Sequence, residues 1–271
     1  MLQQDFISST AAESYFTASM QEAAQARMKL IRDLHLALQG NQFEVAYQLI
    51  VDLSTGIVHK AEALIRWRHP TRGLISPAEF IPAAEETRLI HEIGDWVFWQ
   101  AADQAVLWRQ KHHPQLQISV NMSPVQFREN DKSHAVWIKY LQSLEIPWLS
   151  IVVEITEGLL LDATPEITDQ LLAFHDAGMQ VAIDDFGIGS SSLSYLKKFD
   201  IDYLKIDRSF VSNLAAGSHD AALCEAIIVM AHKLSIKVSA EGVETREHLR
   251  LLTDAGCDYA QGFFFSQPDS A

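Results

Sequence analysis

The spacing of apolar and polar positions predicts a helix at the start of the chain. Apolar residues recur with the period of an α-helix at Met20, Ala24, Met28, Ile31, Leu34 and Leu38. Ser19 and Glu22 have the spacing of a capping box, and Gly40 is a stop signal. We therefore predict a helix over residues 20–39. Such a helix either packs on the body of the domain or links it to an upstream domain.

From residue 42 onward, short apolar runs alternate with helical segments. Eight runs have the length and composition of β-strands: Phe43–Ile50, Val58–Trp67, Gln117–Asn121, Ser150–Ile155, Gln180–Asp184, Tyr203–Ile206, Lys237–Ala240 and Tyr259–Phe264. Helix starts are indicated at Ser76-Pro77, Thr164-Pro165 and Thr245. Only the first two strands are joined by a turn alone, so they are expected to form a hairpin. This pattern favours an α/β fold of the (β/α)8 barrel type, which typically takes ~250 residues.

Composition and charge narrow the functional classes. The chain has 271 residues, of which 48% are hydrophobic and 21% charged, an ordinary globular mixture. Its net charge of −14 argues against binding long nucleic acids through a basic surface. No apolar run approaches the ~18 residues of a membrane span. Cys224 and Cys257 form no CxxC pair, and two free thiols without a signal peptide favour a cytoplasmic location.

Acidic and amide side chains stand on the predicted strands or just after them, most of them at the strand ends. They are Glu62, Asn121, Glu154, Asp184, Asp185, Asp207, Glu241 and Gln261. In a barrel, the carboxyl ends of the strands converge on one mouth, where active sites are built. Acids gathered there repel one another unless a cation neutralises them. Oxygen ligands suit Mg²⁺ or Mn²⁺ rather than Zn²⁺, and the adjacent acids Asp184 and Asp185 suggest two metals.

These residues lie in segments that resemble the EAL family of cyclic di-GMP phosphodiesterases. The resemblance covers about residues 30–268. The matching segments are KAEALIRWRHP at 60–70, SPAEFIPAAEE at 76–86, NMSPVQF at 121–127, EITEGLLLD at 154–162, DDFGIGSSSL at 184–193, LKIDRSFV at 204–211, AEGVET at 240–245 and DYAQGFFFSQP at 258–268. A single tripeptide would be a chance match, whereas eight ordered segments at the family's spacing are specific.

The resemblance implies a modified TIM-type (β/α)8 barrel whose first strand is antiparallel to the rest. It implies an N-terminal tail and linker helix over residues 1–39 and an EAL phosphodiesterase domain over 40–271. The implied activity is metal-dependent hydrolysis of cyclic di-GMP to linear 5′-pGpG, with two Mg²⁺ or Mn²⁺ ions per active site. The implied partners are cyclic di-GMP, a second copy in a homodimer, and an upstream sensory or GGDEF domain. The domain itself is expected to be cytoplasmic and to make no membrane contact, although the parent protein could be attached to a membrane.

The resemblance also assigns roles to individual residues. The catalytic residues would be Glu62, Lys205 and Glu241. The metal ligands would be Glu62, Asn121, Glu154, Asp184 and Asp185. The substrate-binding residues would be Gln48, Leu64, Arg66, Asp207, Glu244 and Gln261. Glu157 would anchor the loop over residues 185–192, which shapes the metal site and the dimer contact.

The sequence departs from the family pattern in that loop. The family usually reads DDFGTGYSSL, whereas this chain has Ile188 in place of the Thr and Ser190 in place of the Tyr. Loss of the threonine hydroxyl would weaken the order of the loop and with it the second metal site. Leu49 and Arg88 replace a usual Pro and Gly, and we expect both changes to be tolerated. The alternative to an active enzyme is therefore a catalytically weak or inactive receptor for cyclic di-GMP.

Overall fold

The computed structural model describes residues 4–127, 133–161, 164–189, 196 and 199–271, and the side chains of residues 20–127 and 134 onward within them. The chain divides into two compact units. The smaller unit contains the residues up to 44 together with 66–90, and the larger contains 45–65 and 91–271. Among the described helices, none is both long enough and apolar enough to cross a membrane.

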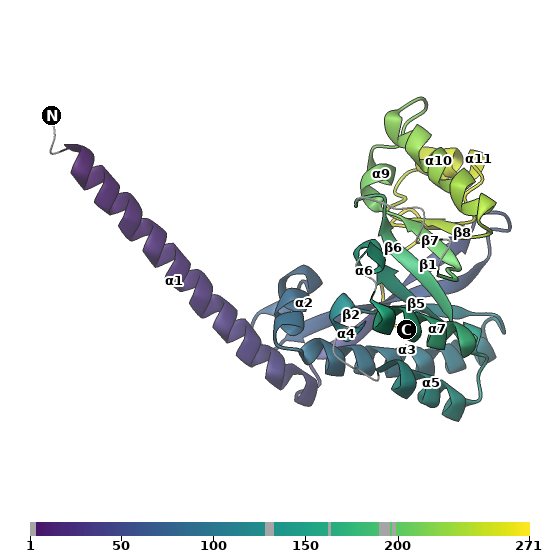
Figure 1. Ribbon diagram of the computed structural model, residues 1–271, viewed down its shortest axis with the longest axis horizontal. Helices are drawn as coiled ribbons and strands as arrows, with labels where there is room; N and C mark the ends of the chain where they lie inside the picture. Colours follow the sequence, from purple (N-terminus) through teal and green to yellow (C-terminus); the bar gives the residue numbers. More distant parts are fainter. Residues whose placement is uncertain (1–3, 128–132, 162–163, 190–195, 197–198) are drawn as a thin grey trace. The chain divides into compact units, whose positions relative to one another are not determined.

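The strands form a barrel, most of which belongs to the larger unit (Figure 1). The strands are β1 Phe43–Asp52, β2 Val58–His69, β4 Gln117–Asn121, β5 Ile151–Thr156, β6 Gln180–Phe186, β7 Tyr203–Ile206, β8 Lys237–Ala240 and β9 Tyr259–Gln261. They pair in the order β1-β9-β8-β7-β6-β5-β4-β2, and a further pairing of β1 with β2 closes the sheet. Strand β1 is antiparallel to β9, whereas the neighbours from β2 to β9 pair in parallel. The predicted barrel with an antiparallel first strand is confirmed.

Helices connect the parallel strands. They are α3 Leu89–Lys111, α4 Pro124–Phe127, α5 Ser133–Leu144, α6 Glu157–Leu161, α7 Pro165–Asp176, α9 Arg208–Ser212, α10 His219–Lys233 and α11 Arg246–Asp254, with the 3₁₀ turn η1 at Trp148–Ser150. The predicted N-caps Thr164 and Thr245 are confirmed, since the side chain of Thr164 accepts from Ile167 N and that of Thr245 from His248 N. Ser76 also stands at a helix start, but its side chain makes no capping hydrogen bond. Helices α3 and α5 pack through Phe98 and Trp137, whose stacked ring centroids lie 4.2 Å apart.

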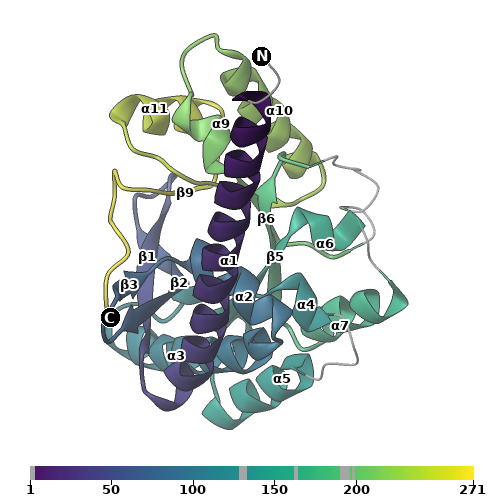
Figure 2. The same cartoon turned by 90° about the vertical axis from the view of Figure 1, so that its left-hand side faces the viewer.

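The smaller unit contains α1 Gln4–Gln39, the short strand β3 Gly73–Ile75 and α2 Pro77–Glu86. Helix α2 lies beside the C-terminal half of α1 (Figure 2), where Arg27 pairs with Glu86. Trp67 is fully buried against Phe43 and Phe80, and its indole Nε1 donates to Oε1 of Gln42 at 3.0 Å. The assignment of residues 1–39 as a linker and 40–271 as the EAL domain stays a prediction.

Two boundaries and one short strand differ most from the sequence pattern. Helix α1 begins at Gln4 rather than near residue 20, because residues 4–18 contain no glycine or proline to interrupt it. Strand β3 was not predicted, since three residues carry too little periodicity. Strand β9 ends at Gln261 rather than Phe264, because the chain turns at Gly262 and Phe264 N donates to Val243 O at 2.9 Å instead.

The hairpin between β1 and β2 is stabilised by Asp52. Its Oδ1 accepts from Ser54 N at 2.9 Å, from Ser54 Oγ at 2.6 Å and from Thr55 N at 3.1 Å. Partial burial raises the pKa of Asp52, but the hydrogen bonds from Ser54 and Thr55 outweigh it and lower the pKa. The hairpin is thus held by a carboxylate in its charged form.

Replacing Asp52 by Ala is expected to cost about 1 kcal/mol of unfolding free energy at pH 7, the usual net value of such hydrogen bonds. A carboxyl group whose pKa is lower in the folded chain than in the unfolded chain stabilises the fold fully above its unfolded-state pKa of about 4. This contribution is lost as the pH falls through the folded-state pKa. Urea unfolding at pH 7 and pH 3 tests this. The difference between wild type and Asp52→Ala should shrink at pH 3, and an equal difference at both would contradict the assignment.

A glycine fixes the packing of α3 against the segment after β4. A Cβ built on Gly94 would lie 2.5 Å from Nε2 of Gln126, whose side chain is 1% exposed. Oε1 of Gln126 accepts from Ser123 N at 3.1 Å, so the amide is held in place. No larger residue fits at position 94 without moving Gln126.

Gly94→Ala is therefore expected to lower the free energy of unfolding by about 1–3 kcal/mol, although alanine is the better helix former. Denaturant unfolding of Gly94→Ala, Gln126→Ala and the double variant measures this. Because Gln126→Ala removes the obstructing amide, the double variant should lose less than the sum of the two singles. Strictly additive losses would show that the two side chains do not compete for space.

Candidate active site

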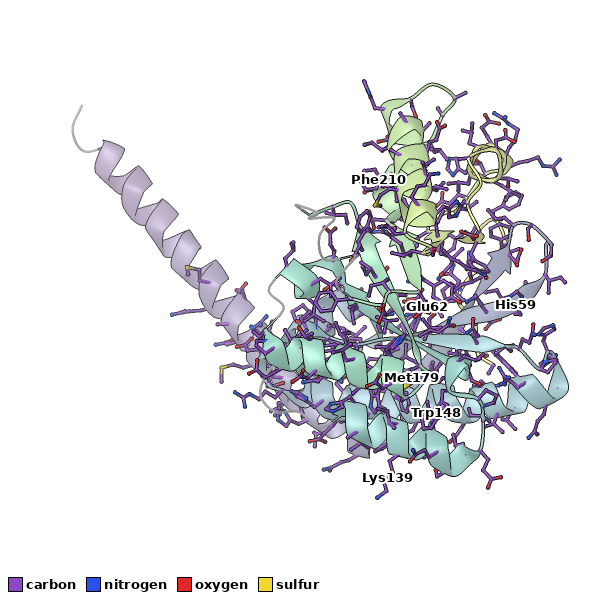
Figure 3. The ribbon with its side chains drawn as sticks, turned by 45° about the vertical axis from the view of Figure 1, so that its right-hand side comes forward. His59, Glu62, Lys139, Trp148, Met179 and Phe210 are labelled. Carbon is purple, nitrogen blue, oxygen red and sulfur yellow. The ribbon has the colours of Figure 1, made fainter. Side chains whose placement is uncertain are left out.

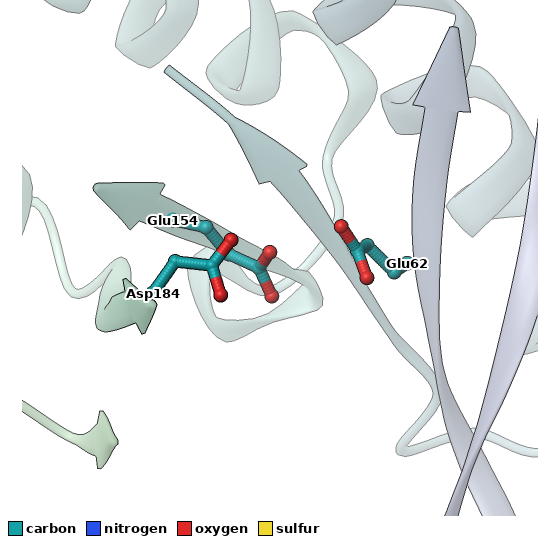
Figure 4. Close-up of side chains that lie close together, drawn as sticks. All are labelled: Glu62, Glu154 and Asp184. Carbon is teal, nitrogen blue, oxygen red and sulfur yellow. The ribbon is translucent and has the colours of Figure 1, made fainter. Parts of the chain in front are cut away.

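Three acidic side chains from three strands of the barrel converge. Glu62 comes from β2, Glu154 from β5 and Asp184 from β6, and their side chains point toward one another (Figure 4). One carboxylate oxygen of each lies within 4.8 Å of the others. Glu62 and Glu154 are 5% and 2% exposed, so water screens their charges little. Figure 3 shows Glu62 in the interior of the larger unit. This acidic cluster requires compensation by positive charge.

Lys205 on β7 supplies part of that charge. Its Nζ lies 2.7 Å from Oε2 of Glu154 and 2.6 Å from Oε1 of Glu241, which follows β8. It also lies 3.3 Å from Oδ1 of Asp184 and 3.4 Å from Oε2 of Glu62. One ammonium therefore faces four carboxylates. Lys205 lies among the acids, as the sequence predicts.

Amide side chains hold Glu62 from two sides. Nδ2 of Asn121 on β4 donates to Oε1 of Glu62 at 2.7 Å, and Nε2 of Gln261 on β9 donates to Oε2 at 2.7 Å. The same Nε2 donates to Oε1 of Gln48 at 2.8 Å, and Gln48 in turn donates to Ser266 O at 3.1 Å. Both oxygens of Glu62 are thereby fixed in orientation.

The environment shifts the pKa values of these groups in different directions. Burial raises the pKa of Glu62, but Lys205 and the amides of Gln261 and Asn121 outweigh it, so the pKa is lowered. Burial and the neighbouring acids raise the pKa of Glu154 well above its usual range despite Lys205. Burial also raises the pKa of Glu241 to about 7. Burial lowers the pKa of Lys205, but the surrounding carboxylates outweigh it and keep the ammonium charged.

A second pair of acids stands beside the cluster. Asp185 has a left-handed φ of 55°, and its N–H donates to Oδ1 of Asp184 at 3.0 Å. Burial raises the pKa of Asp185, with further contributions from Asp184 and Asp207. Asp207 also caps α9, since its Oδ1 accepts from Ser209 N at 2.8 Å. The side chains of Asp185 and Asp207 contact each other, so negative charge continues from Asp184 beside the cluster.

Two contacts hold the loop that follows Asp185. Oε2 of Glu157 accepts from Gly187 N at 3.1 Å, so the predicted anchor does contact this loop. Phe210 of α9 packs on the other side, because a Cβ on Gly187 would lie 2.9 Å from its ring. No signal in the sequence marks Phe210 for this contact, since a motif does not reveal which residue packs on its neighbour. Ile188 is 62% exposed, while Ser190 and residues 191–192 lie outside the described residues.

The other predicted substrate residues are Leu64, Glu244 and Arg66. Leu64 is half-buried on β2, two residues after Glu62 and so on the same face of the strand. Glu244 is exposed in the loop after β8. Arg66 lies in the part of β2 that belongs to the smaller unit. Their roles stay predictions.

The donor set fits a hard divalent cation. Carboxylate oxygens from Glu62, Glu154 and Asp184 converge, and the amide of Asn121 stands next to them. Among the described residues, Oε1 of Gln261 is buried without a hydrogen-bond partner, so it is free to accept one from a water on such an ion. All of these are oxygen ligands of the kind that Mg²⁺ and Mn²⁺ prefer.

Comparison with known proteins identifies the family. The family model for the EAL domain matches residues 31–268. The chain is 41% identical over 258 residues to the bifunctional diguanylate cyclase/cyclic di-GMP phosphodiesterase MucR of Pseudomonas aeruginosa, covering 94% of this chain and 37% of MucR. It is 35% identical over 258 residues to the cyclic di-GMP phosphodiesterase NbdA of the same organism, covering 94% of this chain and 32% of NbdA. The chain thus spans about a third of the length of these relatives.

Solved structures of EAL proteins superpose closely on this chain. The structure described as the PaMucR phosphodiesterase in complex with c-di-GMP superposes with a TM-score of 0.85 at 38% identity, covering 90% of this chain and 98% of that one. The EAL enzyme Bd1971, bound to cAMP and cyclic di-GMP, superposes with a TM-score of 0.86 at 31% identity, covering 94% and 70%. This chain belongs to the EAL domain family.

Proposed function

We propose that this chain is a metal-dependent phosphodiesterase that hydrolyses one phosphodiester bond of cyclic di-GMP and releases linear 5′-pGpG. The observation that carries the proposal is the convergence of Glu62, Glu154, Asp184 and Glu241 on Lys205 in a barrel of the EAL family. MucR and NbdA, which are named as cyclic di-GMP phosphodiesterases, support the choice of substrate.

The proposed metal ligands fall into two overlapping sets. Glu62, Asn121, Glu154 and Asp184 would hold one Mg²⁺ or Mn²⁺ ion, and Asp184 and Asp185 the second. When bound, such ions neutralise phosphate charge and lower the pKa of a coordinated water. The protein's own side chains would position the water and the substrate.

Lys205 and the amides would position the reacting groups. The ammonium of Lys205 fixes the carboxylates and would donate a hydrogen bond to the attacking water, with Glu241 orienting Lys205 from the opposite side. Gln261 and Asp207 would orient water in the same site. Gln48, Leu64, Arg66 and Glu244 would bind the nucleotide, where the guanidinium of Arg66 suits a phosphate because it donates two parallel hydrogen bonds.

A chromatographic time course tests the proposal. Purified protein is incubated with cyclic di-GMP in Mn²⁺ or Mg²⁺ and in EDTA, and the products are separated. We expect 5′-pGpG with either metal and none in EDTA, and activity should return when the metal is added back. Equal turnover in EDTA would contradict the metal-dependent mechanism.

A catalytically weak receptor is the second candidate, and the observation that favours it is Ile188. This exposed side chain lacks the hydroxyl that the family usually has in the loop after Asp185. The same time course separates the two, because a receptor would bind cyclic di-GMP saturably and release no 5′-pGpG.

We also propose a homodimer and an upstream sensory or GGDEF domain. The length of the relatives supports the latter, since the chain covers only 37% of MucR, a protein named for both a cyclase and a phosphodiesterase activity. We place the domain in the cytoplasm, with any membrane attachment supplied by the parent protein. Light scattering tests the dimer, and a monomer with full turnover would contradict a dimer-dependent active site.

A further inference from the structure

Short side chains lie beneath four of the site residues, whereas Lys60 and Tyr203 stand two positions before Glu62 and Lys205. In a strand, residues two apart share a face, so each site residue stands above the residue two positions earlier. The residues two positions before Asn121, Glu154, Asp184 and Glu241 are Ser119, Val152, Ala182 and Ser239. Ser119 pairs with Val152 across β4 and β5, and Ser239 pairs with Lys205 across β7 and β8. Short side chains under long ones leave space between them.

That space is a cavity of about 20 Å³ inside the barrel. Its polar wall consists of Lys60, Ser119, Glu154, Lys205 and Ser239, and the rest of the wall is largely apolar. None of the residues that line it is more than 9% exposed. A cavity needs roughly 10–15 Å³ to hold one water, so this one has room for a single molecule.

Ser239 has a buried hydroxyl with nothing to bind. The residue is 5% exposed, and among the described residues its Oγ has no hydrogen-bond partner. Leaving a buried polar group unpaired costs about 1–3 kcal/mol, which is why such groups are nearly always paired in folded proteins. A ligand in the cavity would supply the missing partner.

The charged groups that line the cavity indicate which kind of ligand it can hold. The ammonium groups of Lys60 and Lys205 disfavour a cation, and the carboxyl group of Glu154 disfavours an anion. A neutral molecule of this size that both donates and accepts hydrogen bonds is water, which usually makes about three such bonds when buried.

We propose that the cavity binds one internal water molecule, anchored by Ser239, in the floor of the site formed by the acids and Lys205. The water bonds to Ser239 Oγ and to the other polar groups of the wall, and so links the floor of the barrel to the layer above it. The proposal does not depend on the phosphodiesterase activity.

Water ¹⁷O magnetic relaxation dispersion, which counts long-lived internal waters, tests the proposal on the intact chain. Ser239→Val replaces the hydroxyl with methyl groups that enter the cavity, and valine suits a strand. We expect this variant to lose one long-lived water relative to the wild type. Ser150→Ala is the matched control, because it removes another buried hydroxyl without a partner that does not line the cavity. The number of long-lived waters in this control should equal that of the wild type.

An unchanged water count in Ser239→Val, or the same loss in Ser150→Ala, would overturn the proposal. A crystal structure of the wild-type chain, at a resolution that shows ordered waters, decides the matter without any variant. Density for a water within hydrogen-bond distance of Ser239 Oγ supports the proposal, and an empty cavity overturns it.

Discussion

Lys205→Met is expected to lower the rate of cyclic di-GMP hydrolysis by roughly 10²–10⁴ and to make the fold depend on divalent metal. Methionine has a similar length but no charge, so four carboxylates lose the ammonium that faces them. Removing one partner from a buried ion pair typically costs ~3–5 kcal/mol, because the remaining charges stay buried and uncompensated. A loss of that size in transition-state stabilisation corresponds to roughly 10²–10⁴ in rate.

The stability measurement distinguishes loss of a catalytic group from general unfolding. In EDTA, Lys205→Met should melt well below the wild type. A bound Mn²⁺ ion would replace part of the missing positive charge, so Mn²⁺ should raise the melting temperature of the variant more than that of the wild type. Circular dichroism melts with Mn²⁺ and with EDTA give both values.

Lys139→Met is the matched control for this experiment. Lys139 is exposed on α5 and lies away from the acids (Figure 3), so its replacement should change neither turnover nor the response to Mn²⁺. Near-normal turnover in Lys205→Met would show that Lys205 only stabilises the fold and would remove it from the proposed mechanism.

The barrel and the acidic cluster were predictable because both depend on strand periodicity. Glu154 and Asp184 stand near the ends of apolar runs and Glu62 lies within one, and parallel strands in a barrel bring such positions together. The pattern does not contain the contacts made across the barrel. That Gln261 reaches both Glu62 and Gln48 depends on the register between β1 and β9, which no local signal specifies.

The ends of helices and strands were harder to predict, because tertiary contacts also decide where they lie. A capping box at Ser19 is compatible with a helix start, but nothing in residues 4–18 interrupts a helix, and α1 continues through them. Gly262 ends β9 because the chain bonds to Val243 there, which is a tertiary contact. Local propensity therefore located the elements, while tertiary contacts set where several of them end.

The loop after Asp185 is the second place where a small change should have a large effect. Gly187 has a φ of 100°, a conformation that residues with a side chain rarely adopt. A Cβ at this position would also lie 2.9 Å from the ring of Phe210. Two independent costs therefore oppose any larger residue, and the loop must shift to relieve them.

Gly187→Ala is accordingly expected to lower kcat/KM for cyclic di-GMP by about a hundredfold, since a displacement of ~1 Å near reacting groups can cost that much. Because Asp185 is two residues away and Glu62 and Glu154 are on other strands, the effect should fall on the second metal. Titration with Mn²⁺, followed by calorimetry, should show one ion retained and the other weakened.

Gly189→Ala provides the control within the same loop. A Cβ there would meet Glu157 at 3.5 Å, an ordinary van der Waals distance, so this variant should keep nearly full activity. The double variant Gly187→Ala, Phe210→Ala makes room for the new methyl group but leaves the backbone strain, and it should regain part of the lost binding of the second ion. Equal activities in the wild type and Gly187→Ala would mean that the loop tolerates displacement, and the position of Asp185 would then not limit the reaction.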